Sequence, residues 1–164
     1  MRQKKRQVPE AYRSTPVPAG QSRQQIEDLL MRAGAEGVVW QVGRTTTTGQ
    51  MQLRFSYRKR VYRFSIPLFA PDAQTDRDRA QDERQRMRAL LWSLKAMIEQ
   101  DQFGLIRFED AAVAWAELAL PAGGTTTVGE VIHQQIERCA MPNLDAAMRA
   151  LPARSPKRED PGRQ

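Results

Sequence analysis

DRDRAQDERQRMRALLWSLKAMIEQD, residues 76–101, is the stretch of the sequence that decides the fold. Its apolar residues recur at the spacing of one helix face, so we expect a single helix over residues 77–101 that packs this face on a core. The face consists of Met87, Leu90, Leu91, Leu94 and Ile98. A line of cations runs about a quarter turn away, at the edge of the helix that meets water. Its members are Arg77, Arg84, Arg88 and Lys95.

Three segments upstream of this helix alternate apolar and polar residues, as half-buried strands do. They lie within residues 38–42, 51–57 and 62–68. We expect an antiparallel meander whose second and third strands are joined by a two-residue turn. If Tyr57 pairs with Arg60, then Phe55 faces Tyr62 and one side of the hairpin is wholly apolar.

The same register predicts a strongly basic second side for this hairpin. It places Arg54 directly opposite Arg63, a pairing of like charges that is unfavourable in a bare sheet and that a bound anion would reverse. The turn adds three more cations, Arg58, Lys59 and Arg60, and the hairpin contains no acid. These five residues are the first candidates for contacts with phosphates. The simpler alternative is a solvated sheet face whose cations blunt an edge.

The long helix supplies the second group of candidates. Arg84, Arg88 and Lys95 extend the basic surface, and Trp92 lies close to their line, where an exposed ring could stack on a nucleic-acid base. A charged stripe of this kind more commonly faces solvent without binding anything. What favours function is that basic residues gather on two neighbouring elements and that aromatic residues lie close to them.

Composition predicts a single small domain with basic tails. The chain has 164 residues and a net charge of +7. Residues 1–21 carry five cations against one acid and residues 152–164 four against two, so the body between them is nearly neutral. We expect both tails to be disordered and residues 22–151 to form one α+β domain. Tails of this kind attract nucleic acid weakly and without sequence preference.

The location expected from sequence is the cytoplasm. No apolar run is long enough to span a membrane, and the basic start of the chain is not followed by the apolar segment of a secretory signal. The one cysteine, Cys139, excludes an internal disulfide and suits a reducing compartment.

The remaining elements are predicted from caps and short apolar patterns. Ser22 opens a first helix with the pattern of a capping box, and Gly34 ends it. Residues 107–120 favour a short helical turn followed by a fourth strand, although a longer helix fits the pattern as well. Thr127 and Glu130 form another capping box that opens a helix through Cys139. The predicted buried face of that helix is Val128, Val131, Ile132, Ile136 and Cys139.

Catalytic chemistry has little support in the sequence. His133 is the only histidine, and one His with one Cys falls short of a zinc site. Several acids on or near the long helix could in principle hold magnesium for a nuclease, but pairs such as Asp82 with Arg86 explain them more simply. We therefore expect no catalytic residues, no metal and no cofactor.

Residues 84–115, RQRMRALLWSLKAMIEQDQFGLIRFEDAAVAW, with the later LPAGGTTTVGE and MPNL, resemble a group of small proteins from bacteriophages and related mobile elements. The group has a tryptophan where this chain has Met87 and a lysine where it has Met97. It has no established activity, so the resemblance implies a phage or mobile-element origin and little about mechanism. It favours the fourth strand over the longer helix.

The function expected from these features is non-enzymatic binding of nucleic acid, DNA or RNA, by an accessory protein of a phage or mobile element. The alternative is a protein–protein interaction module, such as a phage-encoded inhibitor or adaptor of a host complex, whose basic surface meets an acidic protein patch. A structural phage protein is the third possibility.

Overall fold

The computed structural model describes residues 10–45 and 48–138. The chain divides into two compact units, Met1–Glu130 and Val131–Gln164. The first unit is described first, and the last helix, most of which belongs to the second unit, is described at the end. The predicted α+β class is confirmed. Residues 1–9 and 152–164 of the predicted tails, as well as Cys139, lie outside the described residues.

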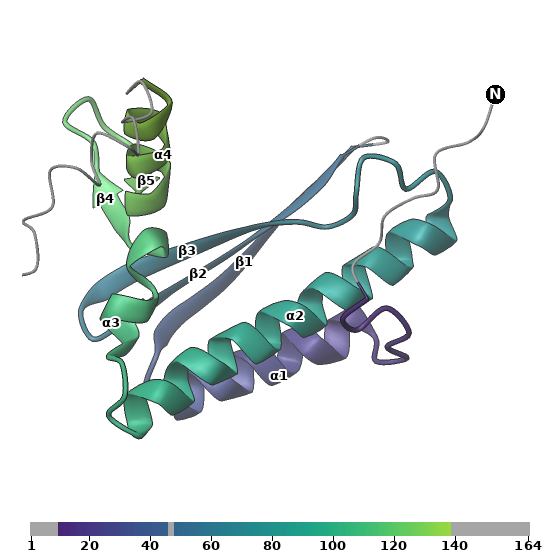
Figure 1. Ribbon diagram of the computed structural model, residues 1–164, viewed down its shortest axis with the longest axis horizontal. Helices are drawn as coiled ribbons and strands as arrows, with labels where there is room; N and C mark the ends of the chain where they lie inside the picture. The colour runs from purple at the N-terminus through teal and green to yellow at the C-terminus, as the bar shows by residue number, and fades with distance from the viewer. Residues whose placement is uncertain (1–9, 46–47, 139–164) are drawn as a thin grey trace, which may run out of the picture. The chain divides into compact units, whose positions relative to one another are not determined.

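The long helix, α2, spans Asp76–Gln102, as its apolar spacing predicts (Figure 1). All five residues of the predicted apolar face are buried. Thr75 caps the helix by accepting a hydrogen bond from the Asp78 N–H at 3.1 Å. The acids of the first turn suit the positive end of the helix dipole.

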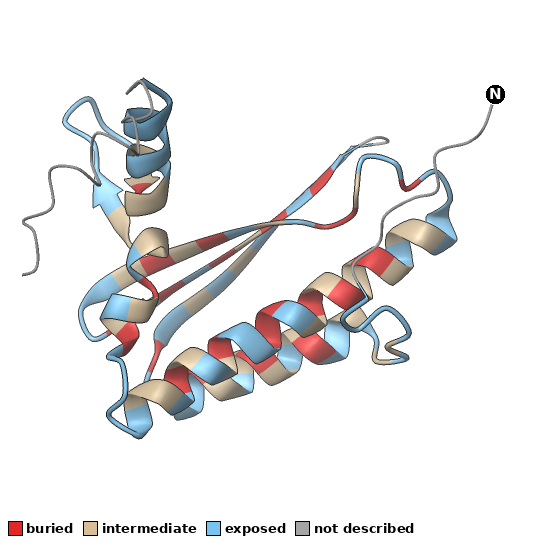
Figure 2. Cartoon of the chain, viewed as in Figure 1, coloured by how far each residue is buried: buried red, intermediate tan, exposed pale blue. Residues whose placement is uncertain are grey.

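The sheet is the predicted three-stranded meander, β1 (Glu36–Arg44), β2 (Gly49–Tyr57) and β3 (Arg60–Pro67), with the strand order β1-β2-β3. Tyr57 pairs with Arg60, so the hairpin has the register expected from burial. One face of the sheet meets α2 and α1 (Ala19–Arg32), which lie side by side (Figure 1). Figure 2 shows the buried residues concentrated along this layer.

The beginning of α1 differs from the prediction. The helix starts at Ala19 with Pro18 as its cap, and Ser22 is buried inside it rather than capping it. Pro18 already holds the extended conformation of a cap residue, with φ -58° and ψ 145°. The predicted end is confirmed, because Gly34 has φ +93° and its N–H donates to the Met31 carbonyl.

Residues 103–127 contain both confirmed and corrected elements. The expected helical turn is α3 (Phe108–Ala111), and the fourth strand, β4, covers only Glu117–Ala119. Val113–Trp115, expected as the start of that strand, is instead a 3₁₀ turn, η1. β4 pairs with a short strand that the sequence does not predict, β5 (Thr125–Thr127).

Helix α4 spans Val128–Arg138 and opens with the predicted capping box. The Thr127 N–H donates to Glu130 Oε2 at 2.8 Å, and the Glu130 N–H donates to Thr127 Oγ1 at 3.3 Å. The predicted buried face of this helix is wrong, because none of the described residues of α4 is buried. Among residues 10–45 and 48–138, no helix is both long and apolar enough to cross a membrane.

Candidate functional site

The two opposed arginines of the hairpin are neutralised by carboxylates of the same chain. Arg54 and Arg63 pair across β2 and β3 as predicted. Arg54 Nη2 lies 2.7 Å from Glu117 Oε2, and Arg63 Nε lies 3.7 Å from the other Glu117 oxygen. Arg63 Nη2 also meets Glu130 at 2.8 Å. The anion that this pair of like charges requires is therefore supplied by β4 and α4.

The two acids are held in place by the local fold. The side chain of Glu117 is only 5% exposed, so its charge is used almost wholly on the two arginines. Hydrogen bonds from the Thr127 N–H and the Thr126 hydroxyl to Glu130, together with the nearby Arg63 charge, keep the pKa of that carboxyl below its usual value. The two carboxylates thus occupy the guanidinium groups that the sequence assigns to phosphates.

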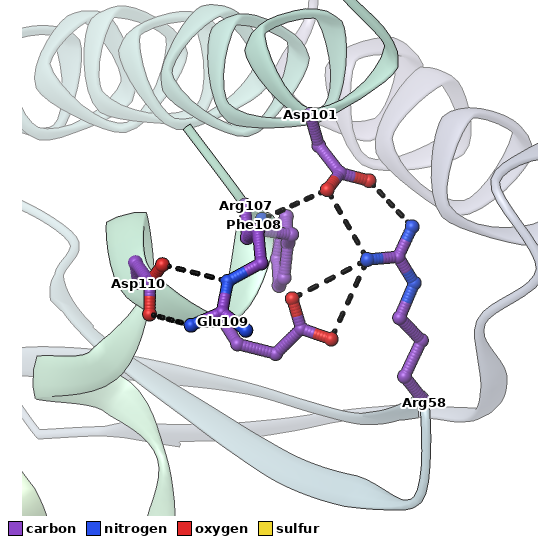
Figure 3. A network of polar contacts seen from close by, with 6 residues as sticks. All are labelled: Arg58, Asp101, Arg107, Phe108, Glu109 and Asp110. Atoms are coloured by element: carbon purple, nitrogen blue, oxygen red, sulfur yellow. Dashed lines mark hydrogen bonds and ion pairs between the residues drawn. The ribbon is translucent and has the colours of Figure 1, made fainter. Parts of the chain in front are cut away.

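Arg58, in the hairpin turn, is also paired within the chain (Figure 3). Its guanidinium makes a two-point contact with Asp101, with Nη2 to Oδ2 at 2.6 Å and Nη1 to Oδ1 at 3.1 Å, and it approaches Glu109 at 3.3 Å. Burial raises the pKa of Asp101, but hydrogen bonds from the Phe108 N–H and Arg58 outweigh this and leave the pKa below its usual value. This network ties the turn to the end of α2 and to α3.

The turn itself uses a backbone conformation that glycine or asparagine usually adopts. Arg58 has φ +49° and Lys59 has φ +65°, the two positive values that a tight type I′ hairpin requires. The pairing of Arg58 with Asp101 offsets part of the cost for that residue. The side chains of Lys59 and Arg60 form no hydrogen bond or ion pair with the described residues 10–45 and 48–138, so these two cations of the hairpin remain available.

The predicted cations of α2 occupy a different setting. Arg84 donates to Gln81 on its own helix, and Arg88 reaches across to Gln25 of α1 at 2.7 Å. Lys95 pairs with Glu99, which is half exposed, at 3.5 Å. Such a surface pair contributes little and leaves the ammonium accessible.

Trp92 lies between two of these cations. The Arg88 guanidinium is 5.5 Å from its ring and the Lys95 ammonium 5.0 Å, so both make cation–π contacts. Trp92 is 40% exposed. An aromatic surface flanked by positive charge is therefore open to solvent.

These residues line a groove between α1 and α2, which we call the helix groove. Its volume is about 540 Å³. Its apolar lining consists of Leu29, Ala33, Leu91 and Ile98, and its cations are Arg32, Arg88 and Lys95. No carboxylate is among the described residues that line it. The described residues that line it are Gln25, Leu29, Arg32, Ala33, Arg88, Leu91, Trp92, Lys95, Ile98 and Gln102. The groove suits a ligand that combines negative charge with a flat or apolar group.

The structure therefore separates the predicted site residues into two sets. Arg88, Trp92 and Lys95 come together at the helix groove, whereas Arg54, Arg58 and Arg63 pair with acids and Arg84 points to Gln81. The sequence did not predict Arg32 as a site residue. It lines the helix groove only because α1 packs against α2. Its only local signal is its place seven residues after Gln25, two helical turns along the same face.

The acids considered for a magnesium-dependent reaction have structural partners. Asp82 accepts the Ala70 N–H and not the predicted Arg86, which donates to the Pro67 carbonyl instead. Glu83 pairs with Arg44 at 2.7 Å. Within residues 10–45 and 48–138, no three side chains of His, Cys, Asp or Glu gather closely enough to hold a metal ion.

Comparisons of the chain with family models, curated proteins and solved structures found no match.

Proposed function

We propose that the protein binds nucleic acid without chemical catalysis and that the helix groove, not the hairpin, is the contact surface. The observation that carries this proposal is that three cations and a half-exposed tryptophan line one groove, with no carboxylate among the described residues of the lining. The setting proposed from the sequence is an accessory role for a phage or mobile element in the cytoplasm of a bacterial host.

Single strands fit this surface better than duplexes do. Trp92 offers a stacking surface, and a base is available for stacking only where it is unpaired. Stacking of one base on an aromatic side chain contributes about 1–3 kcal/mol. Arg32, Arg88 and Lys95 would meet the phosphates on either side, and each such contact adds about 0.7 to the salt slope for a single strand.

The test is a pair of variants with the same loss of charge. Arg32→Gln with Lys95→Gln removes two cations from the helix groove, and Lys59→Gln with Arg60→Gln removes two from the hairpin turn. Binding of a fluorescent oligothymidine and of duplexes is measured by anisotropy over a salt series. We expect the groove variant to lose about 1.4 from the salt slope and the turn variant to keep most of its slope.

Two results would reject the proposal. An equal loss of salt slope in the groove variant and the turn variant would assign binding to overall charge, including that of the tails. No binding of the unmodified protein at low salt would remove nucleic acid as the ligand altogether.

A protein–protein interaction module is the second candidate, because one apolar segment is unusually exposed. Phe103 and Leu105, which follow α2, are 79% and 73% exposed, and Ile106 beside them is about half exposed. This role predicts that a host or phage protein co-purifies after nuclease treatment and that Phe103→Ser with Leu105→Ser abolishes its retention. Retention that resists these changes but disappears on nuclease treatment would favour nucleic acid instead.

A further inference from the structure

Strand β1 lies at an edge of the sheet, and the described residues leave that edge without a backbone partner. The direction of its hydrogen-bonding groups follows from the hairpin. Tyr57 and Arg60 flank a two-residue turn and form a hydrogen-bonded pair. Going back along β2 from Tyr57, every second residue therefore has its N–H and C=O groups directed to β3. The backbone N–H and C=O groups of the other residues of β2, among them Arg54 and Gln52, point to β1.

The partners of these two residues in β1 are Val39 and Gln41. Trp40 and Val42 alternate with them, so their N–H and C=O groups point away from β2 to the open edge. The open edge therefore presents a regular row of donors and acceptors, which is the template for another strand.

Among the residues that the structure describes, β1 lacks the usual protections of an edge strand. Residues 37–43, GVVWQVG, contain no charge and no proline, and Val39 and Val42 are 56% and 42% exposed. Natural sheets place lysine, proline or a covering segment at such a position. The opposite edge, β3, has these features, because Arg60 and Arg63 lie on it and Tyr62 bridges to Ala116.

The sequence of β1 is nearly symmetric about Trp40. In EGVVWQVGR, Gly37 mirrors Gly43 and Val38 mirrors Val42, while the ends are opposite charges, Glu36 and Arg44. An antiparallel copy centred on Trp40 therefore pairs Val38 with Val42 and Gly37 with Gly43, while Val39 meets Gln41. At both ends it brings an acid to a base, Glu36 to Arg44. It also aligns the outward-facing groups of the two strands, as a hydrogen-bonded ladder requires.

One irregularity limits the length of this ladder. The register with β2 shifts between Glu36 and Val39, where Gly37 has φ +61°, as in a β-bulge. The regular edge thus begins after Gly37, and the terminal charges meet through their long side chains. Arg44 already contacts Glu83 but keeps half of its side chain exposed.

We propose that two copies of the chain associate through their β1 strands, antiparallel and centred on Trp40, to form one continuous sheet. Charge complementarity between Glu36 and Arg44 of the second copy selects this partner and this register. The inference does not depend on the proposed function, because the helix groove contributes nothing to it.

Register-specific disulfides test the proposal. In this pairing Val39 lies opposite Gln41 of the second copy, in a pair without hydrogen bonds whose Cα atoms are about 4.5 Å apart, within the range of a disulfide. In the full chain carrying Cys139→Ser, a mixture of V39C and Q41C chains is oxidised mildly and compared with each variant alone. We expect a cross-linked dimer in the mixture and almost none from either variant alone.

The same preparations give the outcomes that overturn the proposal. Cross-linking of Q41C alone would place the centre at Gln41 and refute the register. A monomer by sedimentation at the highest soluble concentration, with no cross-link in the mixture, would mean that the edge is unused or is covered by another part of the chain.

A charge variant gives an independent check in solution. Glu36→Arg places like charges together at two symmetry-related positions, and we expect the dimer to dissociate about tenfold more readily. Glu27→Arg, an equal charge change on α1, serves as the control. An unchanged dimer in Glu36→Arg would contradict the role given to the end charges, and circular dichroism confirms that each variant is folded.

Discussion

The hairpin and the helix groove each gather cations beside aromatic residues, but the fold brings several acids to the hairpin and one exposed acid to the groove. In the hairpin, Arg54, Arg58 and Arg63 meet carboxylates at 2.6–2.8 Å. In the groove, Arg88 and Lys95 meet an amide, a tryptophan ring and one exposed surface acid. The hairpin arginines are therefore neutralised within the chain, whereas the groove cations meet one exposed acid among the described residues, and we infer that the groove is the better surface for an anion.

The largest effect is expected from removing the acid that neutralises the hairpin. Glu117→Gln leaves Arg63, which is only 16% exposed, without a charged partner on that side. We expect the free energy of unfolding in urea to fall by about 3 kcal/mol, the typical cost of breaking a buried pair on one side. At low salt, Glu117→Gln should also bind nucleic acid more strongly than the unmodified protein does, because the hairpin arginines then lack this internal acid.

The control for this variant is Glu99→Gln, whose acid is exposed and pairs with Lys95 on the surface. We expect Glu99→Gln to lower the free energy of unfolding by less than about 0.5 kcal/mol. If Glu117→Gln were as mild as Glu99→Gln, the hairpin arginines would not depend on the internal acid.

Lowering the pH should reduce the free energy of unfolding, because it protonates Asp101, the partner of Arg58 in the hairpin turn. Its folded pKa lies below the usual value, so the unfolded chain binds the proton more readily and stability rises with pH through this region. The contribution is complete above about pH 5 and is lost as the pH falls through about 4, the ordinary aspartate value, toward the lower folded value.

Asp101→Asn should therefore cost about 2 kcal/mol at neutral pH and flatten this part of the acid limb. Urea titrations at several pH values measure both effects. An acid limb of unchanged steepness would assign the pH dependence to other carboxyls, of which Glu130 is the first to examine because its pKa is also lowered.

Much of the fold could be predicted from local pattern, and most of the site could not. The buried face of α2 and the hairpin register follow from alternation within a few residues, which burial of one face enforces. The partners of the hairpin arginines lie 43 to 67 residues further along the chain. No local pattern links Arg54 to Glu117, and Arg32 joins the groove only through the packing of α1 on α2.

The groove should lose affinity when its aromatic surface is removed. Trp92→Ala keeps every cation, and we expect binding of oligothymidine to weaken about tenfold through lost stacking, with an unchanged salt slope. Trp92→Phe should recover part of the affinity. If Trp92→Ala bound as tightly as the unmodified protein, the groove would act by charge alone.

The smallest effect is expected in the hairpin turn. Lys59→Gly places glycine at φ +65°, where an L side chain is strained, and should stabilise the protein by about 0.5–1 kcal/mol. Arg58→Gly relieves the same strain but removes the pairing with Asp101, so it should destabilise. Thermal unfolding of both variants distinguishes these effects, and a gain in both would show that the Arg58 network contributes little.

The most direct test of an open groove and a neutralised hairpin uses the three tryptophan indole N–H signals in a nuclear magnetic resonance titration with oligothymidine. Trp92 lines the helix groove, whereas Trp115 stacks on Phe64 of β3 at 4.8 Å and comes two residues before Glu117. We predict that the Trp92 signal shifts progressively with added oligonucleotide while the Trp115 signal stays in place. A shift of Trp115 with a stationary Trp92 would contradict the account, and would return the binding surface to the hairpin.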